Sequence, residues 1–257
     1  MSPGPTTLAA PELLVFGSTD PDVLRLAGAL GVDVTGLPEP GELLGEGSAA
    51  GATPREVIGE WPWGEALDQW RVSTLAAGSA AITASGPEDT SRPQQVVVAA
   101  WVPVRPVRAV VELDLDVWVD SVEAPIALWS AALGVAVRQV ADGGVVVAVV
   151  DRPSPLDCAG HGPETAVADA VEAMVRSLGR SEGPRGVRVN LVTTPVRTAP
   201  GGTSDPDGRV VAPPPPLDRY PGTIEDDVAG AVRMLLGPGA VGLTGTVLHA
   251  DSGRSWR

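Results

Sequence analysis

Apolar residues along the chain follow two alternating patterns, short continuous runs and longer stretches with helical spacing. Runs such as "LLVF", "QQVVVAAWVPV" and "GGVVVAVV" are bounded by Gly, Asp or Pro. Continuous apolar runs of this length are typical of strands that are buried on both faces of a parallel sheet. The pattern therefore predicts strands at 13–16, 31–36, 94–104, 143–150, 186–192 and 243–251.

Stretches with apolar residues three and four positions apart lie between these runs and predict helices. Pro21 suits a first helical position, with Thr19 or Asp20 as its cap, and Thr223 with Asp226 resembles a capping box. The stretch 116–142 is largely apolar and its helical pattern is interrupted only by Pro125. Further helices are predicted around 63–80 and 164–180, the second with Val167, Val171, Met174, Val175 and Leu178 on one face.

This alternation of strands and helices predicts an α/β fold, a doubly wound parallel sheet within a single domain over residues 1–257. Ligands of such a sheet bind at the carboxyl ends of its strands. Residues 194–222 form a connection rich in Gly and Pro, which predicts a lid-like segment within that domain.

Composition narrows the classes of partner and chemistry. The net charge of -14 makes nucleic acid and anionic membranes poor partners, because both are bound by clustered positive charge. All 18 basic residues are arginine, so no lysine can serve as a Schiff-base former or proton relay. Cys158 is the single cysteine, and the start of the chain has neither a basic region nor a sustained apolar segment. These features predict a cytoplasmic protein without a membrane span.

The second half of the chain resembles the short-chain dehydrogenase/reductase family, in particular its ketoreductase branch. "VEAMVRSLGRSEGPRGVRVNLV" is similar to the family's helix-to-strand segment, and "TIEDDVAGAVRMLLGPGAVGLTGTVLHADSG" to its closing helix and strand. The resemblance implies a Rossmann-like fold and an oxidoreductase that uses a nicotinamide dinucleotide, a Ser, a Tyr-x-x-x-Lys pair and a helix Asn.

Each catalytic position implied by the resemblance holds another residue in this chain. Glu164 stands in place of the tyrosine, Ala168 in place of the lysine, Asp151 in place of the serine and Ser121 in place of the asparagine. In the family the tyrosine donates a proton while the ammonium lowers its pKa. Alanine does neither, and the sole tyrosine, Tyr220, lies in the Pro/Gly-rich connection. We therefore predict no catalytic residues of the family type.

The family's glycine-rich cofactor turn is also altered. Gly17 is the one glycine retained in "FGSTDPDV", while Pro21 and Val23 stand where later glycines belong. Asp20 and Asp22 add negative charge where phosphates would lie. "VAAWV" and Thr193-Thr194 replace two further nicotinamide-site motifs. We expect no cofactor on this chain, and NAD(P) only through an active partner subunit.

Other chemistry in the same region stays open as a set of alternatives. Asp151 and Glu164 could act as a carboxylate pair with separated pKa values. The loop "DCAGHGPE" brings Asp157, Cys158 and His161 near Glu164, as in a metal site or a Cys-His nucleophile, although no second cluster supports these interpretations and His249 lies in the last strand. The seven tryptophans are either packing residues or, where exposed, interface residues: Trp61, Trp63, Trp70, Trp101, Trp118, Trp129 and Trp256.

Our first hypothesis is a non-catalytic subunit that assembles with an active paralogue in a hetero-oligomer, a paralogue acting on a hydroxyacyl or ketoacyl thioester or a polyketide-like substrate. The resemblance implies association through helices near 115–141 and 164–180 and through the closing helix and strand, with Trp129, Val171, Met174 and Val175 as interface candidates. The alternatives are an active oxidoreductase with an atypical site and a small-molecule-binding protein that retains the pocket.

Overall fold

The computed structural model describes residues 13–37, 69–70, 72–73, 92–104, 106–199 and 220–254. Six parallel strands form one sheet in the order β2-β1-β3-β4-β5-β6. The predicted doubly wound α/β fold is confirmed. The strands are β1 Leu13–Gly17, β2 Val34–Gly36, β3 Gln95–Ala99, β4 Val145–Asp151, β5 Arg188–Thr194 and β6 Val247–His249.

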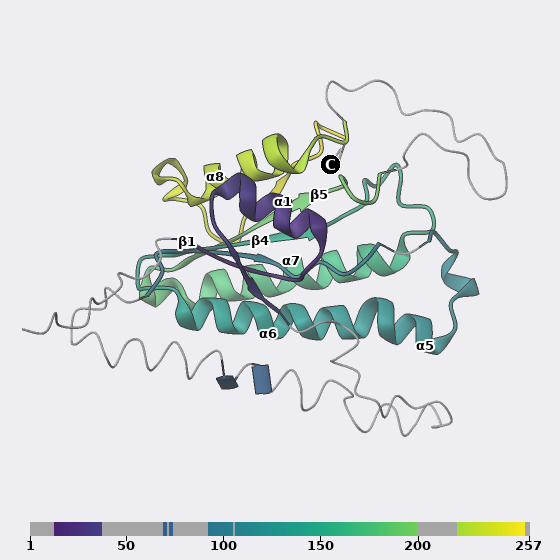
Figure 1. Ribbon diagram of the computed structural model, residues 1–257, viewed down its shortest axis with the longest axis horizontal. Coiled ribbons are helices and arrows are strands. Elements are labelled where there is room, and N and C mark those ends of the chain that lie inside the picture. The colour runs from purple at the N-terminus through teal and green to yellow at the C-terminus, as the bar shows by residue number, and fades with distance from the viewer. Residues whose placement is uncertain are drawn as a thin grey trace, which may run out of the picture.

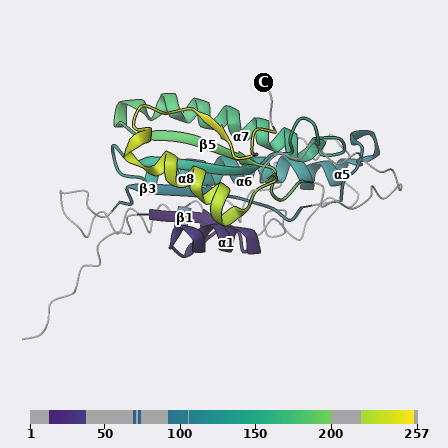
Figure 2. The ribbon, with the colours of Figure 1, turned by 90° about the horizontal axis from the view of Figure 1, so that it is seen from above.

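Helices cover both faces of this sheet. α1 and α8 lie on one face, and the long helices α6 and α7 lie on the other (Figure 1). Viewed from above, β1, β3 and β5 follow one another across the sheet beneath α8 (Figure 2). The helices are α1 Pro21–Leu30, α5 Leu115–Trp118, α6 Ala124–Gln139, α7 Gly162–Ser181 and α8 Ala229–Leu236.

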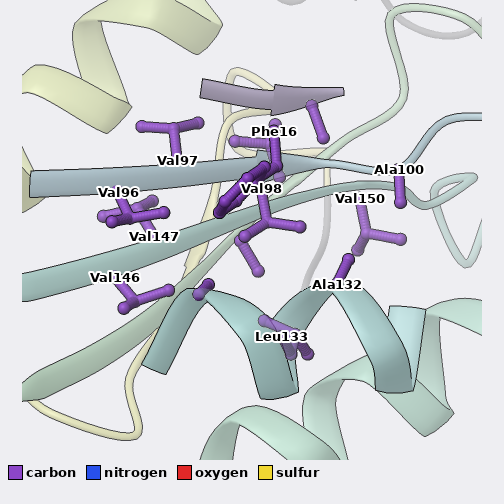
Figure 3. Packing of buried hydrophobic residues seen from close by; sticks show 14 of the residues in the cluster. Phe16, Val96, Val97, Val98, Ala100, Ala132, Leu133, Val146, Val147 and Val150 are labelled. Carbon is purple, nitrogen blue, oxygen red and sulfur yellow. The ribbon is translucent and has the colours of Figure 1, made fainter. Parts of the chain in front are cut away.

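The core lies between the valine-rich strands and α6. Val96, Val98 and Val146 are fully buried, as the continuous apolar runs predict. Ala132 and Leu133 of α6 lie among these valines (Figure 3). Each fully buried aliphatic side chain contributes roughly 1.5–3 kcal/mol through the hydrophobic effect, so the strand runs and the inner face of α6 hold the two layers together.

The helical stretch before β4 changes its hydrogen-bonding pattern near Pro125. A π-helical segment, Val119–Glu123, joins α5 to α6, and Pro125 lies in the first turn of α6. Proline has no N–H for the helix ladder, and π-helical turns occur where that ladder is disturbed. The turn places Ser121 beside the carboxyl edge of the sheet. Residues 115–139 are long and apolar enough to cross a membrane, but 67% of the relevant window is buried, as in a core helix of a soluble protein.

Helix starts agree with the predicted caps, with one correction. Asp20 caps α1, its Oδ1 accepting from the N–H of Asp22. Thr223 Oγ1 accepts from the N–H of Asp226, as predicted, at the start of the π-helical segment Ile224–Val228 that leads into α8. The reciprocal bond comes from Asp227, whose Oδ2 accepts from the Thr223 N–H at 2.8 Å. The residue four positions on completes this cap because the first turn is π-helical.

Two predicted segments lie wholly or largely outside the described residues. These are the helix around 63–80, of which 69–70 and 72–73 are described as helical, and the greater part of the connection 194–222. The described ends of that connection, 194–199 and 220–222, both lie near the carboxyl edge. Arg197 donates to Asp20 there, and the Tyr220 hydroxyl donates to Asp157. The sheet order has its switch point at β1, with β2 on one side and β3 on the other, so this edge is where a ligand crevice is expected.

Candidate functional site

Two neighbouring cavities lie at the carboxyl edge of the sheet, and they share Ser121 and Glu164. The smaller has a volume of about 50 Å³ and the larger about 230 Å³. The walls of the smaller cavity are mostly apolar, with the indoles of Trp101 and Trp129 among them. The remainder of the larger wall comes from Pro106, Arg108, Leu113, Val117, Gly160 and Pro163.

Three of the four residues at the predicted catalytic positions meet at the smaller cavity. Asp151 ends β4, Glu164 lies in the first turn of α7, and Ser121 comes from the π-helical turn. Ala168, one turn further along α7, is fully buried and belongs to the apolar core. The Ser121 hydroxyl donates to the carbonyl of Val117, so its proton is held within its own helix.

Asp151 and Glu164 line one cavity but have different partners. Asp151 Oδ2 contacts the guanidinium of Arg197, and Glu164 Oε2 lies 3.6 Å from His161 Nδ1. Asp151 Oδ1 and Glu164 Oε2 are buried and make no hydrogen bond. A carboxylate pair that shares one proton needs direct contact between the two groups, and the contacts of these two carboxylates run to other side chains.

Arg197, which follows β5, is the central cation of this edge. Its side chain is 4% exposed, and its Nη2 donates to Asp20 Oδ2 at 2.6 Å and to the carbonyl of Val102 at 3.0 Å. Nε donates to Asp22 Oδ2 at 3.3 Å, and Nη1 donates to Asp151 Oδ2. One guanidinium thus joins the segments that follow β1 and β3 to the end of β4.

Burial raises the pKa of Asp151 to about 7. Arg197 opposes this shift, whereas the negative charges of Asp20 and Asp22 add to it. Three carboxylates around one cation leave an excess of negative charge, and protonation of the most deeply buried carboxyl relieves that excess. Asp151 is therefore the group of this cluster that takes up a proton near neutral pH.

The turn between β1 and α1 does not fit the pyrophosphate of a dinucleotide. A Cβ on Gly17 would lie 2.3 Å from Val23 Cγ1, so the Val23 side chain fills the space beside the glycine. Pro21 occupies the first position of α1 and offers no N–H there. Asp20 and Asp22 place carboxylates at the helix N-terminus where a phosphate would otherwise be stabilised.

The loop from Asp157 to Glu164 is organised by ion pairs. Asp157 accepts from Arg254 at 2.9 and 3.1 Å and from the Tyr220 hydroxyl at 2.8 Å. Burial and the bond to Asp157 raise the pKa of Tyr220, so this phenol stays protonated and clamps one end of the 194–222 connection. Cys158 is exposed. Within the described ranges, no group of three or more His, Cys, Asp or Glu side chains could hold a metal ion.

The interface candidates need a correction. Trp129, Val171 and Val175 are at most 1% exposed and belong to the core of this chain, so a partner cannot contact their side chains. Met174 is partly buried and packs against that core. They are buried because the apolar face of α7 and most of α6 pack against the sheet. Trp101 is also buried, while Trp61, Trp63 and Trp256 lie outside the described residues.

Comparison with known proteins agrees with this architecture. The family model described as enoyl-(acyl carrier protein) reductase matches residues 107–255, more than half of the chain. The chain belongs to the short-chain dehydrogenase/reductase family. The predicted family is thus confirmed, and with it membership of an oxidoreductase family. No curated protein matches the chain.

Solved structures of the short-chain dehydrogenase/reductase family share the fold at low sequence identity. A member from Serratia marcescens is 20% identical, with a TM-score of 0.60, and the match covers 98% of this chain and 100% of that chain. A Burkholderia cenocepacia member in complex with NADP is 22% identical, with a TM-score of 0.58 and coverage of 97% and 99%. The enoyl-(acyl carrier protein) reductase of Anaplasma phagocytophilum in complex with NAD is 19% identical, with a TM-score of 0.60 and coverage of 95% and 92%.

Sequence reasoning missed Arg197, the residue with the most contacts in this short-chain dehydrogenase/reductase site. Its partners lie 46 to 177 positions away along the chain, so no local motif marks it. One signal was available. Asp20 and Asp22 follow the first predicted strand and Asp151 follows the fourth, so in a chain without lysine an arginine is the expected counter-charge, and Arg197 lies in the segment directly after a predicted strand.

Proposed function

We propose that this chain is a non-catalytic short-chain dehydrogenase/reductase subunit that assembles with an active paralogue and supports it. The observation that most directly supports this proposal is the environment of the two positions where the family has its proton-transfer pair. Glu164 stands at one, and the other, Ala168, is fully buried among apolar side chains. The tyrosine hydroxyl that could have replaced the donor is bonded to Asp157. The chain has no lysine that could lower its pKa.

The cofactor turn supports the same proposal. Val23 fills the space beside Gly17, and carboxylates surround the N-terminus of α1. A hydride-transfer enzyme must hold its nicotinamide cofactor against the substrate. Proton transfer and cofactor binding have thus changed together, while the sheet and its covering helices are retained. In this proposal the hydride transfer belongs to the partner subunit.

The surface of α7 is consistent with an assembly role. One side of the helix is buried against the sheet, and the opposite side presents Ala173 and Ser177 to solvent. Short side chains allow a second helix to approach closely and form a wide interface. The resemblance to the family implies association through this layer and through the closing helix and strand. The thioester or polyketide-like substrate of the partner rests on family analogy alone.

The test is native mass spectrometry of the chain co-expressed with its nearest short-chain dehydrogenase/reductase paralogue. We expect a mixed oligomer whose turnover exceeds that of the paralogue alone. Calorimetric titration with NADP and NADPH should give binding by the mixed oligomer and none by this chain alone. Separate homo-oligomers only, with unchanged turnover of the paralogue, would contradict the proposal.

A second candidate function is binding of a small molecule without turnover. The two cavities and the unpartnered buried atoms Asp151 Oδ1 and Trp101 Nε1 favour it, because buried polar atoms without a partner are rare in folded proteins. Titration of the chain alone with S-acetoacetyl-N-acetylcysteamine, a short thioester, would reveal saturable binding.

An active enzyme with an atypical site would instead turn this thioester over with NADPH. It would lose that turnover in the double variant Asp151→Asn, Glu164→Gln.

A further inference from the structure

We propose that the crevice at the carboxyl ends of β1, β3 and β4 is a guanidinium site, which the chain fills with its own Arg197 and whose three carboxylates exclude dinucleotides. This site lies within one chain and does not depend on assembly with a paralogue. The contacts of the buried Arg197 side chain support it.

The donors of the guanidinium match the acceptors of the crevice. All three nitrogens of Arg197 donate, to Asp22 at 3.3 Å, to Asp151, and to both Asp20 at 2.6 Å and the Val102 carbonyl at 3.0 Å. A planar group with five N–H donors in a fixed fork suits acceptors that approach from several sides. These acceptors come from segments after three different strands, so the site is part of the tertiary fold.

Trp101 selects for the planar shape of the cation. The Arg197 guanidinium carbon lies 4.9 Å from the centroid of the Trp101 ring. Trp101 is 2% exposed and is held between β3 and the cavity wall. An indole face binds a flat delocalised cation by stacking and by its quadrupole, and a compact ammonium lacks the stacking part. The site should therefore prefer guanidinium to methylammonium.

Local hydrogen bonds hold the arginine in place. The N–H groups of Thr198 and Ala199 donate to the carbonyl of Pro195 at 2.9 and 2.7 Å, and the Val196 N–H donates to Thr194 Oγ1 at 3.2 Å. These bonds close a tight turn directly after β5, with Arg197 inside it. The side chain therefore projects into the crevice from a fixed backbone, and the cation is built into the fold.

The charge of the site disfavours the ligand that relatives hold at this edge. Asp20, Asp22 and Asp151 surround one positive charge, so an approaching pyrophosphate would meet net negative charge even before Arg197 moves. Removal of Arg197 increases that excess. The variant that empties the crevice should therefore accept a small flat cation and still reject NADPH.

The experiment is chemical rescue of Arg197→Gly by guanidinium ion, followed by thermal unfolding. Guanidinium chloride at 1–20 mM, far below denaturing concentrations, should raise the melting temperature of this variant saturably and restore at least half of the loss. Methylammonium should restore less. NADPH should not raise the melting temperature of either the wild type or the variant.

Arg25→Ala is the matched control. Arg25 also pairs with Asp22, at 2.8 Å, but its side chain is 49% exposed, so its loss removes the same charge without opening a buried site. Guanidinium should leave its melting temperature unchanged. Equal stabilisation of both variants, or a melting temperature of either wild type or Arg197→Gly that rises with NADPH, would overturn the proposal.

A second measurement covers the case in which Arg197→Gly does not fold. Phenylglyoxal modifies accessible guanidinium groups, and mass spectrometry of peptides from the folded wild-type chain reports each arginine separately. Arg197 should react at least tenfold more slowly than Arg25. Equal rates would overturn the proposal. Both measurements use the isolated chain, so their failure is distinguishable from failure to form a mixed oligomer.

Discussion

Single residues decide which groups the site can bind, and the clearest example is the buried carboxyl of Asp151. This carboxyl has been drawn out of water with a cation on one oxygen and no partner on the other. Sequence reasoning could place Asp151, Glu164 and Ser121 at one edge, because strand ends and the helix start that follows them converge there. It could not find Arg197, because that side chain is defined by contacts between distant segments.

Asp151 should make stability depend on pH. Its pKa rises from 3.8 in the unfolded chain to about 7 in the fold. Between these values the folded state binds a proton that the unfolded state does not, so the contribution of Asp151 to stability is highest below pH 4 and falls until pH 7 is passed. From pH 5 to pH 8 we expect the wild type to lose roughly 2–3 kcal/mol relative to Asp151→Asn. Urea denaturation of both proteins at the two pH values measures the difference, and parallel pH profiles would contradict it.

Val23 and Gly17 should show coupled energetics. A Cβ on Gly17 meets Val23 Cγ1 at 2.3 Å, with the next atoms, Ala99 O and Val34 Cγ1, at 3.4 Å. Gly17→Ala should therefore destabilise the fold by about 2 kcal/mol through overpacking, and Val23→Ala by about 2 kcal/mol through lost burial. In the double variant the clashing methyl is gone, so its loss should fall short of the sum by about 1 kcal/mol or more. Additive losses in denaturant titrations would show that Val23 does not close the turn.

At the scale of elements, the pattern of apolar runs predicted β3, β4 and β5 because each of these strands is buried on both faces. It predicted the helix starts through Pro21, Asp20 and Thr223, whose bonds are local. It marked the interruption at Pro125 but could not foresee the π-helical turn that precedes it, because apolar spacing does not report which carbonyl each helical N–H reaches. Nor could it tell that the apolar face of α7 is buried against the sheet of the same chain, because periodicity indicates that a face is buried but not which surface covers it.

Glycines in two helices should respond in opposite ways to alanine. Gly179 of α7 lies against the segment before β6, and a Cβ there would be 2.9 Å from the backbone nitrogen of Gly245. Gly179→Ala should cost about 2 kcal/mol, because backbone must shift. Gly28 of α1 is exposed with no atom within 4 Å of its Cβ position, so Gly28→Ala should stabilise by about 0.8 kcal/mol through helix propensity. Thermal unfolding of the two variants tests both signs, and destabilisation by each would refute the contrast.

For the whole molecule, the carboxyl edge and the two faces of the sheet have separate roles. The Arg197 cluster closes the carboxyl edge. On one face, Arg25 joins α1 to the segment that leads into α8, because its Nε donates to Glu225 at 2.7 Å. α6 and α7 cover the other face of the sheet (Figure 1). In our proposal, selection for association with a paralogue retains this layer although the chain no longer carries out the family's chemistry.

One substitution on each face of the sheet shows which face forms the interface with the paralogue. Ala173→Arg places a long charged side chain on the exposed side of α7, where a close helix contact with the paralogue would have to form. It should abolish the mixed oligomer in native mass spectra and lower the melting temperature of the isolated chain by no more than about 1 °C, since surface substitutions change stability little. Leu24→Arg is the control, because Leu24 is 53% exposed on α1, on the opposite face of the sheet and outside the segments through which the resemblance implies association. It should leave the mixed oligomer intact. If Leu24→Arg abolished assembly while Ala173→Arg did not, the interface would lie on the α1 face of the sheet, and α7 would owe its family resemblance to packing within the chain alone.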